Sequence, residues 1–261
     1  MGIVNLTPDS FSDGGAHEAV SDAIKHCEQL VREGVDLLDL GAESTRPGAT
    51  PVPLAQELAR LMPVLKAAVQ LNIPISIDTY KPEVMQQALD VGADIINDIW
   101  GLRRTGAAAV VAQHPRCGVC VMHMHGEPQT MQVKPLQAPV VSDVFDFLSQ
   151  QSQTLQAMGI EASRICLDPG YGFGKTVAQN FELLAHQAML AQLHHPVLVG
   201  WSRKSSLGAV TGCEVHERLV PSVAAALLAV ERGAHVVRVH DVQATRQALQ
   251  VRQAMYDATA R

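Results

Sequence analysis

The stretch Arg32-Glu-Gly-Val-Asp-Leu-Leu-Asp-Leu40 decides the fold, because nearly the same pattern returns twice later in the chain. The second copy is Asp90-Val-Gly-Ala-Asp-Ile-Ile-Asn-Asp98, and the third is Glu231-Arg-Gly-Ala-His-Val-Val-Arg-Val239. In each copy a glycine follows a helical pattern, where it can adopt the left-handed conformation that ends a helix. An aliphatic run with the length of a buried parallel strand comes next. Each copy therefore predicts a helix that ends at the glycine and a strand that follows it.

The same alternation extends outward from these junctions over the whole chain. Strands are expected near residues 2–6, 35–40, 74–78, 94–99, 118–124, 164–168, 196–201 and 234–239. Helical patterns lie near 16–33, 54–70, 82–91, 105–113, 140–158, 176–191, 215–232 and 241–258. Parallel strands need crossover helices, and eight strands are enough to close a sheet. The sequence thus predicts an α/β fold, a single (β/α)8 TIM-barrel domain over residues 1–261, with an open doubly wound sheet as the alternative.

The composition limits the class of protein. The chain has 261 residues, the size of one such barrel, and is 47% hydrophobic but 4% aromatic, which predicts an aliphatic core and excludes a disordered chain. A net charge of −6 argues against binding to nucleic acid or to anionic membranes. Scattered cysteines, no membrane-length apolar stretch and no signal peptide predict a soluble, cytoplasmic protein. Because the chain starts inside a predicted strand, we expect natural residues upstream of it.

Polar side chains occur in series where the predicted strands end. They are Asn5, Asp39 with Glu43, Asp78, Asn97 with Asp98, His123, Asp168, Ser202 with Lys204, and Arg238 with His240. The carboxyl ends of barrel strands meet at one rim, which carries the active site in enzymes of this fold. We therefore expect these side chains to converge there.

Two loops at the predicted rim contain unusual residues. In Asn5-Leu-Thr-Pro-Asp-Ser-Phe-Ser-Asp-Gly-Gly15 the apolar Phe11 stands in a polar loop, which points to a ligand or a neighbouring loop as its partner. In Gly41-Ala-Glu-Ser-Thr-Arg-Pro-Gly48 the guanidinium of Arg46 suits a phosphate or a carboxylate. The alternatives are an ordinary polar turn for the first loop and a solvated surface arginine for the second.

The segment Leu167-Asp-Pro-Gly-Tyr-Gly-Phe-Gly-Lys-Thr176 ends like a phosphate-binding loop. Pro169, however, stands where such a loop needs its first glycine, so we reject that interpretation. The remaining signal is Asp168, a carboxylate on a glycine-rich loop. It can accept two parallel N–H donors from a flat, aminopyrimidinone-like ring, whereas its ordinary role would be to cap the next helix.

Cationic residues gather after the last two predicted strands. Arg203 and Lys204 follow the seventh strand, and Arg238 and His240 end the eighth, where barrels often bind phosphate. These residues predict a phosphorylated substrate, and surface ion pairs are the alternative. The segment Cys117-Gly-Val-Cys120, in the fifth predicted strand, does not indicate a zinc or redox site, because strand alternation places its cysteines on opposite faces.

Taken together and in this order, the motifs resemble those of bacterial dihydropteroate synthases from residue 2 to about residue 242. They include the two loops above, Ile-Ser-Ile-Asp-Thr, Asn-Asp-Ile, Leu-Asp-Pro-Gly-Tyr-Gly-Phe-Gly-Lys, Ser-Arg-Lys-Ser and Arg-Val-His-Asp-Val. The resemblance implies a transferase of folate biosynthesis and a sulfonamide target. It would condense 6-hydroxymethyl-7,8-dihydropterin diphosphate with 4-aminobenzoate into 7,8-dihydropteroate and diphosphate. It also implies a homodimer that uses Mg²⁺.

The resemblance further implies roles for individual residues of this sequence. The expected pterin contacts are Asp78, Asn97, Met122, Asp168, Lys204 and Arg238. The expected diphosphate contacts are Asn5, Arg46, Arg238 and His240, with Asn5 also at the magnesium ion. The aminobenzoate site is expected to include Phe11, Pro47, Lys204 and Ser205, with Thr45 as a further substrate contact and Asp13 ordering the first loop. The residues expected to act in catalysis are Asn5, Asp13, Arg46, Asp168, Lys204, Arg238 and His240.

The implied chemistry agrees with these residue types. Diphosphate leaves an electron-rich dihydropterin cation, so cations should hold the leaving group and a carboxylate should face the ring. An aromatic amine is neutral at pH 7, so this dissociative substitution needs no strong general base. The main alternative is a catalytically silent pterin-binding relative. A barrel aldolase acting through a Schiff base on Lys204 and a folate-binding methyltransferase are more distant ones.

Overall fold

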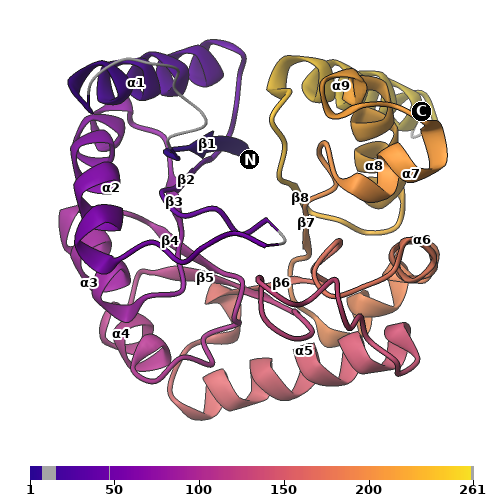
Figure 1. Ribbon diagram of the computed structural model, residues 1–261. Helices are drawn as coiled ribbons and strands as arrows, with labels where there is room; N and C mark the ends of the chain where they lie inside the picture. Colours follow the sequence, from indigo (N-terminus) through magenta and orange to yellow (C-terminus); the bar gives the residue numbers. More distant parts are fainter. Residues whose placement is uncertain (8–15, 47, 260–261) are drawn as a thin grey trace.

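The glycine junctions form as the sequence predicts. Gly34, Gly92 and Gly233 have φ angles of 83°, 118° and 87°, in the left-handed region that ends a helix. In a computed structural model that describes residues 1–7, 16–46 and 48–259, each of these glycines lies between a helix and the following strand (Figure 1). A local signal therefore sets the alternation on which the rest of the fold is built.

Strands and helices alternate along the described residues, with the helices on the outside (Figure 1). The strands are β1 (Gly2–Asn5), β2 (Leu38–Gly41), β3 (Ile75–Asp78), β4 (Ile95–Asp98), β5 (Gly118–Met122), β6 (Ile165–Asp168), β7 (Leu198–Val199) and β8 (Val236–Val237). The α-helices are α1 (Ala16–Arg32), α2 (Leu54–Ala68), α3 (Pro82–Val91), α4 (Ala107–Gln113), α5 (Val140–Ala157), α6 (Val177–Ala185), α7 (Ser205–Thr211), α8 (Leu219–Glu231) and α9 (Val242–Thr259). The 3₁₀ helices are η2 (Val69–Leu71), η3 (Ala162–Arg164), η4 (Gln187–Leu193) and η5 (Val215–Glu217).

The strands close into a barrel. β1 to β6 form one parallel sheet in sequence order, and β7 pairs in parallel with β8. Parallel bridges join these two parts, from Leu167 to Val197 on one side and from Gly2 to Val239 on the other. The fold is therefore the predicted TIM barrel, and the alternative of an open, doubly wound sheet is wrong.

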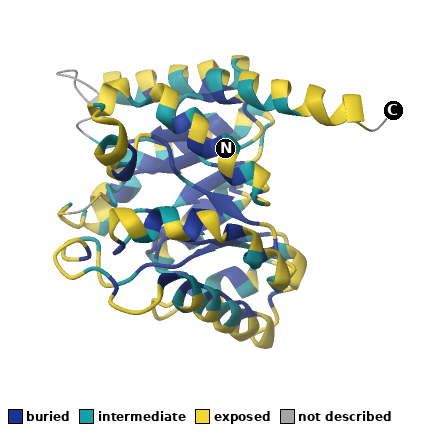
Figure 2. Cartoon of the chain, turned by 90° about the vertical axis from the view of Figure 1, so that its right-hand side faces the viewer, coloured by how far each residue is buried: buried dark blue, intermediate teal, exposed yellow. Residues whose placement is uncertain are grey.

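Strand alternation divides polar from apolar residues. Asn5 pairs in register with Gly41, Gly41 with Asp78, and Asp78 with Asn97, so these residues point to the same side of the sheet. That side is the barrel interior. The residues between them point to the helices and are buried in the main core: Val4, Leu40, Ile77 and Ile96. Figure 2 accordingly shows buried strands inside helices whose outer faces are exposed.

A small apolar cluster fills the barrel interior below the polar layer. Met1, Cys120 and Leu198 are its buried members. The Met1 nitrogen donates a hydrogen bond of 3.0 Å to the carbonyl oxygen of Val237, which connects the residue before β1 to β8.

The last third of the chain differs from the prediction in detail. The predicted helix over 176–191 is α6 followed by η4, and α7 was not predicted because its seven residues are too few for a periodic pattern. β7 is shorter than expected, since the chain turns away after Gly200 and Lys204 N–H donates to the Trp201 carbonyl at 3.2 Å. None of the described helices combines the length and apolar character needed to cross a membrane.

Candidate active site

A guanidinium group between two carboxylates lies in the barrel interior. Arg238, directly after β8, donates from Nε to Asp39 Oδ2 at 2.6 Å and from Nη2 to Asp78 Oδ2 at 2.8 Å. Asn97 donates from Nδ2 to the same Asp39 oxygen at 3.3 Å. The four side chains come from β2, β3, β4 and the end of β8, so closure of the barrel brings them together.

Burial and mutual attraction set the protonation of this network. Burial raises the pKa of Asp78 to about 7 against the lowering effect of Arg238, and Asp39 raises it further. Burial also acts to lower the pKa of Arg238, but Asp39 and Asp78 outweigh it, so that pKa lies above its ordinary value. Arg238 is therefore a permanent cation, and Asp78 is a carboxyl group that can change its protonation near neutral pH.

Asp168 lies at the end of β6, opposite Met122 in register. Its Oδ1 accepts the backbone N–H of Gly170 at 2.7 Å. Gly170 has a φ angle of 68°, and a Cβ there would lie 1.8 Å from the carbonyl oxygen of His123, so no other residue fits without moving the backbone. Burial raises the pKa of Asp168, and the charge of Lys204 opposes it most strongly. The glycine-rich loop thus presents a buried carboxylate on the barrel rim.

Lys204 lies between this loop and Arg238. Its ammonium group donates to the carbonyl of Tyr171 and lies 4.7 Å from the centre of the Phe173 ring. A Cβ on Gly200 would lie 3.9 Å both from Lys204 Nζ and from Arg238 Cβ, which places the two cations next to each other. Burial lowers the pKa of Lys204 to about 8, while Asp168 raises it. The anionic Asp168 and both cations therefore share one side of the rim.

An apolar cluster borders these polar groups. Met122 is 3% exposed and packs with Ile99, and Phe173 and Trp100 lie against them. Next to this cluster is a cavity of about 360 Å³ that includes open solvent. It is lined by Glu43, Ser44, Thr45, Ala49, Pro51, Tyr80, Trp100, Arg104, Glu127, Pro128 and Gln129. Of the predicted site residues that the structure describes, Thr45 lines this cavity, and the acid–guanidinium network does not.

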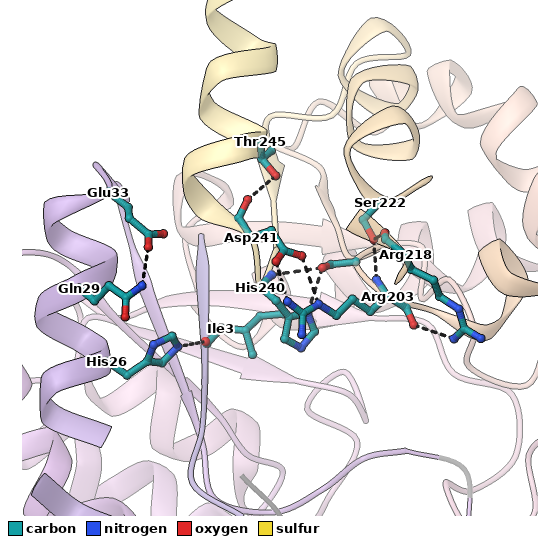
Figure 3. A network of polar contacts seen from close by, with 11 residues as sticks. Ile3, His26, Gln29, Glu33, Arg203, Arg218, Ser222, His240, Asp241 and Thr245 are labelled. Atoms are coloured by element: carbon teal, nitrogen blue, oxygen red, sulfur yellow. Dashed lines mark hydrogen bonds and ion pairs between the residues drawn. The ribbon is translucent and has the colours of Figure 1, made fainter. Parts of the chain in front are cut away.

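His240 is held by the loop after β7 (Figure 3). Ser202 Oγ accepts the backbone N–H of His240 at 3.2 Å and lies 2.9 Å from His240 Nδ1. Burial lowers the pKa of His240 to about 3, and Arg203 and Arg238 lower it further. His240 is thus a neutral hydrogen-bonding group, not the extra cation that the sequence suggested.

The remaining predicted site residues occupy less enclosed positions. Asn5 is half-buried at the end of β1 and points into the barrel, and Arg46 and Ser205 are exposed. Arg46 still lowers the pKa of His240 by its charge, so the two lie within electrostatic reach. Three predicted residues lie outside the described ones: Phe11, Asp13 and Pro47. Among the described residues, no cluster of three His, Cys, Asp or Glu side chains could hold a metal ion.

Three residues of the strand-end series do not join the network. Asp98 points outward and accepts the backbone N–H groups of Trp100 and Leu102, both at 2.8 Å. His123 points outward to α5, and Glu43 binds the hydroxyl of Tyr80 at 2.6 Å and the ammonium of Lys81. Strand alternation is the reason for Asp98 and His123, because each follows an inward-facing residue by one position. Glu43 lies two positions beyond the end of β2, and its partners Tyr80 and Lys81 hold it away from the network.

Two residues in the centre of the site received no substrate-binding or catalytic role from the sequence, although Asp39 belongs to the predicted strand-end series. Asp39 is fully buried and joins Arg238 to Asn97, and Phe173 lies beneath the Lys204 ammonium group. The alternation did contain a signal for Asp39. It lies two positions before Gly41 and therefore on the same face as Asn5 and Asp78.

Comparison with known sequences identifies similar proteins. The profile of the family described as "Pterin binding enzyme" matches residues 1–240. The dihydropteroate synthase of Neisseria meningitidis serogroup B is 48% identical over 261 residues, which covers 98% of this chain and 92% of that protein.

Solved structures agree over the whole chain. Dihydropteroate synthase from Burkholderia cenocepacia, complexed with 7,8-dihydropteroate, has a TM-score of 0.91 at 53% identity and covers 100% of this chain and 92% of its own. The Xanthomonas albilineans enzyme with 4-aminobenzoic acid has a TM-score of 0.93 at 49% identity, with coverage of 98% and 92%. The Yersinia pestis enzyme in a sulfonamide drug complex has a TM-score of 0.93 at 41% identity, with coverage of 98% and 94%.

Proposed function

This chain belongs to the dihydropteroate synthases, a family of pterin-binding enzymes, and from that premise we propose how its barrel rim performs the reaction. The enzyme is a transferase of folate biosynthesis. It condenses 6-hydroxymethyl-7,8-dihydropterin diphosphate with 4-aminobenzoate and releases 7,8-dihydropteroate and diphosphate. The observation that carries the assignment of residues is the acid–guanidinium network of Arg238, Asp39, Asp78 and Asn97, with Asp168 and Lys204 beside it.

The pterin ring binds to the buried acids. In its ionised form Asp168 accepts two N–H donors of the aminopyrimidinone edge, because a carboxylate offers two acceptor atoms in one plane. Asp78 and Asn97 bind the other polar atoms of the ring, and Met122 covers an apolar face. Arg238 stacks on the ring while Asp39 and Asp78 hold its guanidinium group.

The diphosphate binds to the cationic end. Arg46 and Arg238 supply positive charge, and neutral His240 supplies a hydrogen bond. The bond between the pterin methylene carbon and the diphosphate oxygen breaks, and its electron pair leaves with diphosphate. The amine nitrogen of 4-aminobenzoate then bonds to that carbon and releases its proton. Lys204 contacts the substrates where the ring and the amine meet, and Ser205, Thr45, Phe11 and Pro47 contribute to the aminobenzoate site.

Mg²⁺ fits the residues at the diphosphate end. Asn5 has a hard amide oxygen and lies on the inward face of β1, in register with Gly41, a residue with no side chain. Mg²⁺ commonly takes only one or two protein ligands and completes its shell with substrate phosphates and water. When bound, it would neutralise charge on the leaving diphosphate. The ordering role of Asp13 in the first loop belongs to the same proposal.

The proposal extends to the assembly of the enzyme and to its location. Several large apolar side chains of α8 and α9 are at least two-fifths exposed, namely Leu219, Val220, Leu228, Val251, Met255 and Tyr256. Exposed apolar groups of this kind favour association, so we propose a homodimer formed through these helices. We also propose a cytoplasmic enzyme that, like the Yersinia pestis relative, binds sulfonamide drugs. A single barrel domain over 1–261 remains part of the proposal.

The catalytically silent relative is not favoured, because the similar proteins are synthases and one structure holds the product, 7,8-dihydropteroate. The test is diphosphate release from the pterin diphosphate with and without 4-aminobenzoate. A synthase releases diphosphate in proportion to added 4-aminobenzoate and forms dihydropteroate. Tight pterin binding in calorimetry without any turnover would instead support the silent relative.

A further inference from the structure

Lys175, which ends the rejected phosphate-loop motif, is enclosed by protein. Its side chain is 2% exposed, and Nζ donates to the carbonyl oxygen of Gly170 at 2.8 Å and of Phe173 at 3.3 Å. Both carbonyls belong to the loop 168–174, which joins β6 to α6 and begins with Asp168. The ammonium group therefore ties two points of the loop that presents the substrate-facing carboxylate.

A histidine and an aspartate complete the surroundings of this lysine. Lys175 Nζ lies 2.9 Å from His123 Nδ1, and His123 Nε2 lies 3.0 Å from Asp143 Oδ2 on α5. An ammonium group only donates, so Nδ1 accepts and Nε2 carries the ring proton that Asp143 accepts. Burial lowers the pKa of His123 to about 2, and Lys175 lowers it further. Each donor of Lys175 thus has a protein partner, which leaves none for a phosphate group.

The charge of Lys175 acts on the substrate anchor. Burial raises the pKa of Asp168, and the charges of Lys204, Lys175 and Arg238 oppose it. Burial also lowers the pKa of Lys175 to about 7, which Asp168 opposes. The ionisable groups that face Lys175 and its histidine are Asp168 on β6, His123 directly after β5, Asp143 on α5, Lys204 before α7, and Arg103 and His125 in the neighbouring loops.

We propose that Lys175 is a positioning residue for the pterin substrate: it fixes the backbone of the loop 168–174 and places a buried positive charge within reach of the Asp168 carboxylate. This inference rests on the proposed function. The loop geometry supports it, because Gly170, Gly172 and Gly174 all have positive φ and a Cβ on Gly174 would lie 2.2 Å from the His125 carbonyl oxygen. A loop packed this closely over β5 has little freedom once its carbonyls are held.

The first test is Lys175→Met, which keeps the length of the side chain and removes the charge and the donors. We expect kcat/KM for the pterin diphosphate to fall about 10- to 100-fold, with KM for 4-aminobenzoate unchanged within about twofold. Without the positive charge Asp168 holds its proton more tightly, so the acid limb of the pterin pH profile should move up by about half a pH unit or more. The matched control is Lys66→Met on the exposed side of α2.

A second variant keeps the proposal testable if Lys175→Met does not fold. Asp143 is 36% exposed, and Asp143→Asn removes only its charge. Since Asp143 helps Lys175 to retain its proton, the basic limb of the pterin profile should then move to lower pH. The proposal would be overturned if the variants had a lower melting temperature but the acid and basic limbs of their pterin pH profiles were unchanged. Lys175 would then have only a structural role. Absence of turnover in the unaltered enzyme would count against the proposed function instead, and calorimetric pterin binding by the two variants would still decide the role of Lys175.

Discussion

Asp39 shows how much of the site depends on a residue that holds other side chains and has no proposed contact with the leaving group. It is fully buried, and its carboxylate holds Arg238 at 2.6 Å and Asn97 at 3.3 Å. Arg238 is proposed to stack on the pterin and to contact the diphosphate, so its position matters for both ends of one substrate. A buried ion pair of this kind adds little net stability, but removal of one partner is costly because it leaves the other charge uncompensated.

We therefore predict that Asp39→Asn lowers the free energy of unfolding by about 2 kcal/mol and reduces kcat/KM for the pterin diphosphate at least about tenfold. Urea denaturation and steady-state kinetics measure the two effects. Asp22→Asn, at an exposed position on α1 paired with Lys25, is the control and should change neither. Unchanged kinetics in Asp39→Asn would show that Arg238 does not need this partner.

The pKa of Lys204 predicts how activity depends on pH. Burial lowers its pKa to about 8, so its charge is present below that pH and is lost above it. We expect kcat/KM for the pterin diphosphate to fall as the pH rises through about 8, in addition to the fall that deprotonation of Lys175 causes near pH 7. Arginine stays charged in proteins, so Lys204→Arg should move this fall to higher pH even though its overall rate is lower. A basic limb at the same pH in both enzymes would mean that Lys204 does not cause it.

At the scale of elements, the packing of the loop 168–174 on the end of β5 determines where the loop places Asp168. Gly170 contacts the backbone of His123 so closely that any Cβ would force the two segments apart. The backbone N–H of the same residue holds Asp168 at 2.7 Å. The loop therefore orients the carboxylate only as long as it stays packed on the end of β5.

The prediction for this element is that Gly170→Ala loses pterin binding as well as stability. Alanine with positive φ costs about 1 kcal/mol by itself, and displacement of the loop adds to that. Gly212→Ala is the matched control, since Gly212 has a φ angle of 74° but no atom within 4 Å of its added Cβ. Gly212→Ala should lose only the stability that alanine with positive φ costs, and it should keep its activity. Thermal unfolding and kinetics measure these two quantities. Equal losses of stability and full activity in both variants would contradict the role assigned to the loop.

For the whole molecule, the barrel leaves one group of apolar side chains uncovered. On α8 and α9, Val220 is 75% exposed and Val251 is 74% exposed, whereas the inner faces of the same helices are packed against the core. A monomer that exposed these residues would lose the free energy that their burial provides. A second copy of the chain is the partner that the proposed homodimer requires.

We expect the enzyme to sediment as a dimer and the double variant Val220→Asp with Val251→Asp to sediment as a monomer. Two charges placed in an apolar interface cannot be paired by the same surface on a second copy. Val133→Asp is the control, because Val133 is 77% exposed in the loop before α5, outside the proposed interface. A monomeric parent enzyme, or a double variant that stays dimeric, would show that these helices do not form the interface.

The elements with strong local signals were predictable, and the ones that depend on distant contacts were not. Gly34, Gly92 and Gly233 fixed the order of helices and strands because each needs only its own backbone conformation. The ends of β7 and β8 and the short helix α7 were missed, since their bounds depend on where the chain leaves the barrel for the site. The predicted convergence of strand ends was right for Asp78, Asn97, Asp168, Lys204 and Arg238. It was wrong for Asp98 and His123, which point outward.

By itself, the sequence determined the barrel, the family and the residues that face its rim, because glycine conformation, strand periodicity and ordered motifs are local properties of the chain. Only the tertiary structure decided how these residues act on one another. The sharing of Arg238 between Asp39 and Asp78, the neutral state of His240 and the enclosure of Lys175 all depend on burial and on partners far away in sequence. Protonation and electrostatic attraction are set by distance and solvent exposure, which exist only once the strands have closed.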